Sequence, residues 1–128
     1  MKEEQKKHGS FCWNELLTTD VDGAKKFYGE LFGWETEDSD MTGMTYTIIK
    51  ANGQEAGGMM LMPPECQGMP PAWGVYVTVD DVDETAKKTE ALGGKIFRQP
   101  EDIPGVGRFC VLSDPQGAVI CAITFKEM

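Results

Sequence analysis

Histidine and cysteine carry much of the catalytic and metal chemistry of proteins, and this sequence contains few of either. The single histidine, His8, lies within the first ten residues, which are charged and are expected to form a solvated tail. The four cysteines, Cys12, Cys66, Cys110 and Cys121, have no Cys-x-x-Cys spacing, so we expect reduced thiols. Gly-x-Ser-x-Gly, Walker A and Gly-x-Gly-x-x-Gly motifs are absent from the sequence. Serine-hydrolase and nucleotide-binding chemistry is therefore not predicted.

Charge and length limit the class of protein. The chain has 128 residues, enough for one domain or two closely coupled half-domains, and 21 acidic against 12 basic residues give a net charge of −9. Such a surface repels a phosphate backbone, so we expect no nucleic-acid partner, and it favours cationic small molecules. The sequence has no apolar run of the ~20 residues that a membrane span needs, and its N-terminus lacks an apolar signal core. We therefore expect no membrane partner and a cytoplasmic location.

The spacing of apolar residues predicts one strand, one helix and three further strands between residues 11 and 62. Alternation over residues 11–18 indicates the first strand. A helix follows, capped by Thr19 or Asp20 and ended by Gly33. Its apolar face is expected to consist of Ala24, Phe27, Tyr28, Leu31 and Phe32. Strands are predicted over residues 34–37, 45–51 and 54–62, and Asn52-Gly53 predicts a hairpin turn between the last two.

The same order of elements is predicted again after a Pro- and Gly-rich linker at residues 63–71. A strand over residues 72–79 leads to a helix that begins at Asp80 or Asp81 and ends at Gly93-Gly94. Three strands follow over residues 95–98, 108–113 and 118–125, with a loop at residues 99–107.

Identical residues recur at an offset of 60 in the two halves, on equivalent elements. The pairs are Trp13 and Trp73, Thr18 and Thr78, Asp20 and Asp80, Glu30 and Glu90, and Gly33 and Gly93. They indicate a duplication. We expect an α+β fold with a disordered tail at residues 1–10 and two tandem βαβββ modules, residues 11–62 and 72–125, joined by the linker 63–71. Curved mixed sheets with helices on the outside would form a cup, where function should be sought.

Three stretches resemble the vicinal oxygen chelate superfamily, which includes glyoxalase I, bleomycin-resistance proteins and extradiol dioxygenases. They are LLTTDVDGAKKFYGELFGW (16–34), VYVTVDDVDETAKKTEALGG (75–94) and LSDPQGAVICAITF (112–125). The resemblance covers nearly all of residues 11–125. It implies paired βαβββ modules and, by analogy, a homodimer, but it does not fix a reaction.

The resemblance also implies where a metal ion would bind. Metal-dependent members place four His or Glu ligands on four strands, and the corresponding positions here are Trp13, Gly74, Cys121 and one residue of the stretch 56–62, AGGMMLM. Only the cysteine among these can bind a cation, so we expect neither the usual metal site nor another cofactor. An alternative is a metal site with unusual ligands, such as Glu15 and Cys121.

Because side chains alternate along a strand, every second residue from these positions is expected to line the cup. The side chains expected to bind a ligand are Trp13, Glu15, Met60, Met62, Trp73, Tyr76, Arg108, Cys110 and Cys121. The turn of the last hairpin is expected to be centred between Pro115 and Gln116, so that residues whose numbers add up to 231 lie opposite each other. Arg108 and Cys110 are included because this register places them on the same face as Cys121. Cys110 would then pair with Cys121, as two buried thiols or as a cross-strand disulfide.

Several of these residues have two interpretations. Trp13 either fills the core or stacks on a ligand, and the methionines either pack the core or line the pocket. Glu15 and Arg108 either neutralise each other or act on a ligand. In the second case Arg108 would hold an anionic group, and Glu15 would serve as acceptor or general base.

Four classes of function follow from this pattern. The preferred hypothesis is a glyoxalase- and bleomycin-resistance-like protein that lacks the usual metal ligands and binds a small, partly aromatic or amphipathic molecule. The alternatives are a metal-dependent lyase, isomerase or dioxygenase with unusual ligands, a drug-sequestering resistance protein, and a protein–protein interaction module.

Overall fold

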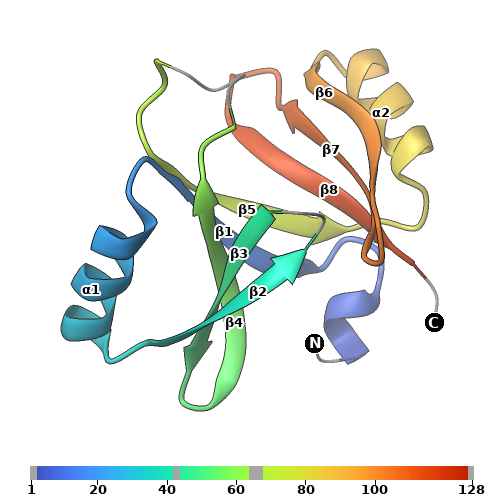
Figure 1. The fold of residues 1–128 in the computed structure, drawn as a ribbon. Helices are drawn as coiled ribbons and strands as arrows, with labels where there is room; N and C mark the ends of the chain where they lie inside the picture. The colour runs from blue at the N-terminus through green and yellow to red at the C-terminus, as the bar shows by residue number, and fades with distance from the viewer. Residues whose placement is uncertain (1–2, 42–43, 64–67, 127–128) are drawn as a thin grey trace. The chain divides into compact units, whose positions relative to one another are not determined.

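The computed structural model describes residues 3–41, 44–63 and 68–126, and it confirms the α+β class (Figure 1). Within these residues the order of strands and α-helices is one strand, one helix and three strands, twice. The chain divides into two compact units. The α1 unit comprises Asn14–Gly74, and the α2 unit comprises the residues up to Trp13 together with those from Val75 onward.

The α1 unit contains a four-stranded sheet with one helix against it. Its elements are β1 (Phe11–Thr18), α1 (Val21–Phe32), β2 (Glu35–Met41), β3 (Met44–Ala51) and β4 (Gln54–Leu61). The strand order is β2-β3-β4-β1, with β1 parallel to β4 and the other pairs antiparallel. Leu16, Ile49 and Met59 form its buried core, against which α1 packs. The predicted turn between β3 and β4 is present, with positive φ at both Asn52 and Gly53.

Local signals in the sequence locate the ends of α1 correctly, but its apolar face only in part. The Asp20 carboxylate accepts a hydrogen bond from Gly23 N at 2.9 Å, and Gly33 ends the helix with φ 75°. Ala24 and Tyr28 pack on the core, as expected. Phe27, however, is 58% exposed, and Leu31 and Phe32 are exposed to a similar extent. The expectation of one buried stripe of five residues is therefore wrong.

The α2 unit repeats this arrangement. Its elements are β5 (Ala72–Thr78), α2 (Val82–Ala91), β6 (Lys95–Ile103), β7 (Gly107–Ser113) and β8 (Val119–Phe125), in the strand order β5-β8-β7-β6. β5 is parallel to β8. Val79, Val82, Ala86, Cys110 and Ala122 form the core beneath α2. Asp81 caps α2 by accepting hydrogen bonds from Asp83 N and Glu84 N, which selects one of the two residues predicted for that role.

Strand β6 is longer than the sequence predicts, because it continues to Ile103 through residues expected to form a loop. Pro100 lies within it, where a proline would interrupt a central strand. Here β6 ends the strand order of its unit, and its pairing with β7 shifts register between Arg98 and Glu101. An edge strand with an irregularity of this kind tolerates a residue that has no N–H to donate.

The described part of the expected tail is ordered against the α2 unit, which corrects that prediction. Glu3–Lys6 forms a short 3₁₀ helix. Gly9 N donates to Thr78 O at 2.7 Å, and Thr78 N donates to Ser10 O at 2.8 Å. Asp80 N donates to Nδ1 of His8 at 3.0 Å. Backbone hydrogen bonds of this type are not visible in side-chain composition, which is why a charged segment was expected to be solvated.

The unit boundaries also differ from the modules expected at residues 11–62 and 72–125. The α2 unit includes Cys12 and Trp13 because they pack with Tyr76 and Ile123. The division therefore falls within strands β1 and β5 and leaves the order of elements unchanged.

Candidate functional site

In each unit the helix covers one face of the sheet and leaves the other face without a helix. Several residues expected at the binding site lie on this helix-free face. Strand register defines this helix-free face. In the α1 unit Glu15 lies opposite Gly58 and Leu17 lies opposite Met60, while Gly58 lies opposite Ile48 on the next strand. Because side chains alternate along a strand, these residues share the face opposite buried Leu16 and Met59.

Glu15 and Tyr46 form one polar feature of the helix-free face of the α1 unit, which also carries Ser39 and the ion pair of Lys50 and Glu37 on β2 and β3. Tyr46 Oη donates a hydrogen bond to Glu15 Oε2 at 2.8 Å, and both side chains are half-buried. The tyrosine ring lies over Gly58, at which a Cβ atom would collide with Oη and Cζ of Tyr46. Gly58 is thus the residue that allows Tyr46 to reach the carboxylate. The sequence identified Glu15 but gave no signal for Tyr46.

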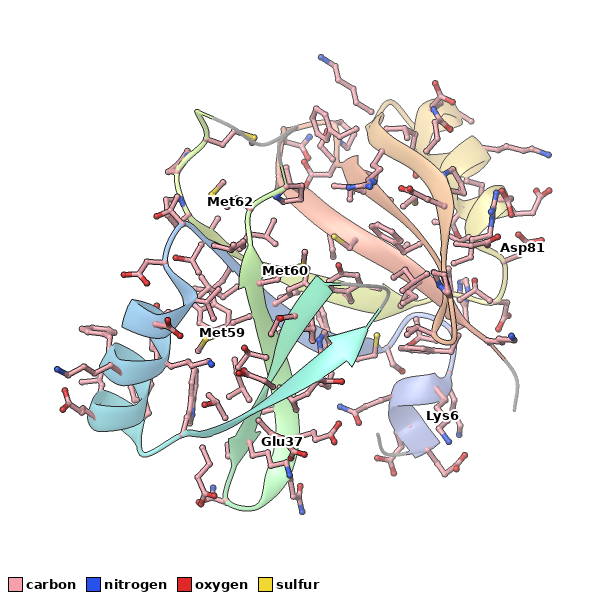
Figure 2. The ribbon with its side chains drawn as sticks, in the orientation of Figure 1. Lys6, Glu37, Met59, Met60, Met62 and Asp81 are labelled. Atoms are coloured by element: carbon pink, nitrogen blue, oxygen red, sulfur yellow. The ribbon has the colours of Figure 1, made fainter. Side chains whose placement is uncertain are left out.

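The three methionines around the end of β4 divide between the two faces, and Figure 2 labels them. Met59 is fully buried in the core beneath α1, with 0% of its surface exposed. Met60 is half-buried on the helix-free face, as expected. Met62 follows the end of β4 and is also half-buried, and its backbone N–H donates to Thr18 O at 3.0 Å.

In the α2 unit the helix-free face is largely aromatic and aliphatic. Tyr76 lies opposite Cys121 in the parallel pair of β5 and β8, and Cys121 lies opposite Val111 on β7. The rings of Tyr76 and Phe109 are 6.5 Å apart, and Trp13 packs against the same cluster. Trp13, Tyr76 and Cys121 therefore belong to one apolar cluster.

Arg108 and Cys110 lie on the other face, so the register predicted for the last hairpin is wrong. Cys110 lies opposite Ala122, and Arg108 lies opposite Thr124. The numbers of opposed residues thus add up to 232, whereas the predicted register required 231. Five residues separate β7 from β8, which moves the centre of the turn to Gln116. A shift of one residue moves every side chain to the opposite face of a strand.

The actual partners of Arg108 are acidic residues of its own unit. Its guanidinium binds Asp83 through Nε and Nη2, each at 3.1 Å, and Asp102 through Nη1 at 3.1 Å. These carboxylates raise the pKa of Arg108 above its ordinary value. Arg108 therefore joins α2 to β6 on the helix side of its sheet, and it is no longer a candidate for holding an anionic ligand on the helix-free face.

Arg98 is the guanidinium that sequence reasoning overlooked. Its Cζ lies 5.5 Å from the centre of the Phe109 ring, and its Nε is 2.6 Å from Glu101 Oε2. Hydrogen bonding and charge from Arg98 lower the pKa of the Glu101 carboxyl. The available signal was that the chain contains only Arg98 and Arg108 as arginines. Strand periodicity did not reveal Arg98 because β6 is irregular around it.

Trp73 was expected among the ligand-binding residues, but the structure places it against α1. Its Nε1 donates to Tyr28 Oη at 3.1 Å, and its ring lies 5.9 Å from that of Trp34. Trp73 precedes Gly74 and therefore points to the face opposite that of Tyr76.

A cleft of about 480 Å³ near the start of α1 is lined by both polar and apolar residues, and two of its charged residues form an ion pair. Lys25 Nζ lies 2.8 Å from Asp38 Oδ1, to which Thr47 Oγ1 also donates at 2.8 Å. Hydrogen bonds from Lys25 and Thr47 lower the pKa of the Asp38 carboxyl. These contacts join Lys25, Asp38 and Thr47 in a structural network.

The two buried thiols of the described residues with a shifted pKa, Cys12 and Cys110, are not activated nucleophiles. Burial raises the pKa of Cys110, and it raises that of Cys12, whose Sγ contacts Tyr76 O at 3.5 Å. A raised pKa lowers the thiolate fraction at neutral pH. Cys110 lies opposite Ala122 and its thiol is free, so the alternative of a disulfide between Cys110 and Cys121 is wrong. Cys66 lies outside the described residues.

Comparison with known families identifies the class to which these units belong. The model of the Glyoxalase/Bleomycin resistance protein/Dioxygenase superfamily matches residues 11–122. The chain belongs to this superfamily, which confirms the resemblance found in the sequence. No helix among the described residues has the length and apolar character that a membrane crossing requires.

Three relatives illustrate the range of similar proteins. "Putative glyoxylase CFP32" of Mycobacterium bovis is 45% identical over 116 residues, which are 90% of this chain and 44% of that protein. "Anthracycline biosynthesis protein DnrV" of Streptomyces peucetius is 33% identical, over 86% of this chain and 45% of that protein. This chain thus spans about half the length of the curated relatives it matches. Methylmalonyl-CoA epimerase from Mycobacterium tuberculosis shares the fold, with a TM-score of 0.60 and 17% identity over 99% of this chain and 94% of that chain.

The residues at the expected metal positions do not fit a divalent ion. Trp13 and Gly74 offer no donor side chain, Cys121 offers one thiol, and residues 56–62 contain no carboxylate or imidazole. Glu15, the nearest carboxylate, accepts a hydrogen bond from Tyr46. In the described parts of the chain, no three His, Cys, Asp or Glu side chains gather where they could hold a metal ion. Divalent sites need several convergent donors of this kind, so we derive no chemistry from a metal.

Proposed function

We propose that this protein binds a small, partly aromatic or amphipathic molecule on the helix-free face of its α1 unit, without a metal ion of the usual kind. The observation that carries the proposal is the Glu15–Tyr46 hydrogen bond of 2.8 Å, which lies beside apolar residues of β1, β3 and β4. Leu17, Ile48 and Met60 share that face. A few placed polar groups within an apolar lining are typical of small-molecule sites.

The chemistry of Glu15 indicates what the ligand must carry. A carboxylate can accept several hydrogen bonds, so Tyr46 can fix its orientation while a ligand N–H or O–H binds as well. Met60 supplies a flexible, polarisable contact that adapts to a ring. The net charge of −9 favours a cationic group in the ligand. The name of the Streptomyces relative, an anthracycline biosynthesis protein, supports a planar aromatic ligand.

Glu15 is also the group best placed to take a proton if the bound molecule reacts. A general base must lie within hydrogen-bonding reach of its substrate, and the contact with Tyr46 would hold the carboxylate in one position. Sequestration without turnover uses the same face and the same contacts. A cytoplasmic location stays a prediction from the sequence.

A calorimetric titration with doxorubicin, a planar aromatic amine, tests the proposal. We expect binding at pH 7 that the variant Glu15→Gln weakens about tenfold, the effect of losing about 1.4 kcal/mol from one charge-assisted contact. Glu30→Gln is the matched control, because Glu30 is exposed on α1 and should not affect binding. Amide chemical shifts should change at residues 15–17 and 58–60. Shifts confined to α1, or equal affinities for both variants, would contradict the proposal.

A metal-dependent lyase is the second candidate, and it is favoured by the name of the mycobacterial relative, a glyoxylase. Elemental analysis of the protein purified without chelator separates the two candidates. One bound Ni, Zn, Mn or Fe ion per chain, together with turnover of a glutathione or mycothiol hemithioacetal that EDTA abolishes, would establish the lyase. Doxorubicin binding that EDTA leaves unchanged would support the metal-independent site.

A further inference from the structure

The cleft near the start of α1 is a cavity that the proposed function does not use. It has a volume of about 480 Å³ and is lined by the first turn of α1, strands β2 and β3 and the end of β4. Thr47 lies opposite Asp38 on β2 and opposite Met59 on β4. Because Met59 is buried beneath α1, the cleft lies on the helix side of the sheet. Glu15 and Tyr46 belong to the other face, so the cleft is separate from the site proposed above.

An ordered ion pair forms one wall of the cleft. Lys25 Nζ and Thr47 Oγ1 each lie 2.8 Å from Oδ1 of Asp38. Thr47 is 1% exposed, whereas the side chain of Asp38 is 52% exposed. The carboxylate is therefore held from its buried side and is accessible to a molecule in the cleft. Both contacts are made by the same carboxylate oxygen, and a carboxylate has about four acceptor positions in all.

The pairing of these charges indicates which kind of ligand fits. A cation must compete with Lys25 for Asp38, and an anion must compete with Asp38 for Lys25. A hydroxyl group both donates and accepts a hydrogen bond, so it can bind the carboxylate and the ammonium without separating them. Within the described ranges, no three acidic side chains of the cleft gather where they could hold a metal ion. These observations favour a neutral ligand with several hydroxyl groups.

The rest of the lining suits the same ligand. Thr19 and Thr45 are exposed and add two hydroxyl groups. Val21 and Leu61 add aliphatic surface, and Leu61 is 56% exposed. A sugar ring carries hydroxyl groups around its edge and C–H groups on its faces, so it matches both parts of this lining. The volume lies within the range of small-molecule sites, about 300–1,000 Å³.

We propose that this cleft binds a neutral polyhydroxylated molecule of the size of a monosaccharide. Hydroxyl groups of the ligand donate to Asp38 and accept from Lys25, and one face of the ring packs on Val21 and Leu61. The binding is independent of any ligand on the helix-free face, because the sheet separates the two sites. A ligand with about twelve non-hydrogen atoms binds weakly, and we expect a dissociation constant of about 1–10 mM.

NMR titration of the nitrogen-15-labelled protein with D-glucose, D-galactose, D-mannose and D-ribose tests the proposal. At least one of these sugars should shift the amide signals of residues 20–25, 38 and 45–47, and the shifts should saturate below about 100 mM. The amide signals of α2, residues 82–91, serve as the internal control and should not change. A uniform change over both helices would indicate an effect of the solvent and would count against the site.

Three variants test the contacts. Asp38→Asn should weaken sugar binding about tenfold, because it replaces a charged acceptor with a neutral amide. Glu37→Gln is the matched control on the same strand: its carboxylate pairs with Lys50 at 2.7 Å on the opposite face, so sugar binding should not change. Thr45→Phe should abolish binding by filling the cleft. Thr45 is exposed, so this variant should fold like the wild type.

The outcomes that would overturn the proposal are distinct. One is the lack of a saturating shift with any of the four sugars. Another is equal sugar affinity of the wild type and either Asp38→Asn or Thr45→Phe, since the sugar would then bind elsewhere. Methylammonium chloride is the charged comparison: if it moved the same amide signals at lower concentration than every sugar, the cleft would be a cation site. None of these results bears on the doxorubicin titration, which reports on residues 15–17 and 58–60.

Discussion

Substitution of Gly58 by alanine tests the geometry of the candidate site most directly. Gly58 has no positive φ, so the backbone accepts an alanine, and replacing glycine within a strand gains about 0.5–1 kcal/mol. The new Cβ, however, would collide with the hydroxyl end of Tyr46. Tyr46 must then turn away and release Glu15.

The expected cost follows from these opposing effects. Overpacking costs about 1–3 kcal/mol, and a hydrogen bond to a charged group contributes about 1.5–3 kcal/mol. Part of this free-energy cost is recovered, because both side chains are half-buried and can form hydrogen bonds with water instead. We therefore expect Gly58→Ala to lower the free energy of unfolding by about 2 kcal/mol, measured by urea denaturation followed by circular dichroism. For a chain of this size the melting temperature should fall by about 6 °C.

A double-mutant cycle isolates the cause. In a Tyr46→Ala background the obstacle is gone, so Gly58→Ala should be neutral or stabilising by about 0.5 kcal/mol. Gly57→Ala is the comparison, because a Cβ there would lie 2.5 Å from the backbone oxygen of Asn14, which cannot turn away. It should destabilise both backgrounds equally. If Gly58→Ala cost the same with and without the tyrosine ring, the reasoning about Tyr46 would be refuted.

Three further predictions concern caps, pH and thiols. Asp81→Ala should lower stability by about 1 kcal/mol through loss of the α2 cap, whereas Asp80→Ala should cost less than half of that; thermal melts distinguish them. The pKa of Asp38 is lowered in the folded state, so its contribution to stability is present above the unfolded value of about 3.9 and is lost as pH falls through the folded pKa. The melting temperature of Asp38→Asn should therefore lie below that of the wild type at pH 7 and converge with it near pH 2, and a constant difference would contradict this. Cys12 and Cys110 are buried with raised pKa, so mass spectrometry should find them labelled by iodoacetamide at pH 8 only after denaturation.

Features that depend on neighbours in the sequence were predicted well. The start of α1 at Asp20 and its end at Gly33 follow from capping chemistry, and the turn at Asn52-Gly53 follows from positive φ at both residues. Strand β1 has the predicted bounds, Phe11–Thr18. The face shared by Glu15 and Met60 was also predicted correctly, because alternation along a regular strand needs no tertiary information.

Features that depend on the length of a turn or on contacts between distant residues were not predicted from the sequence. The pairing of β7 with β8 is displaced by one residue from the predicted register, and this moves Arg108 from the expected binding face to Asp83 and Asp102. Composition did not show that Gly9 and Ser10 would pair with the backbone of Thr78.

The amino-acid sequence by itself determined the superfamily and the order of the elements, because these depend on residue type and spacing along the chain. The tertiary structure decided which polar group Glu15 meets, which arginine lies on the helix-free face and which rings of α1 remain exposed. These outcomes depend on register and packing between strands and helices far apart in sequence, where a shift of one residue exchanges the two faces of a sheet.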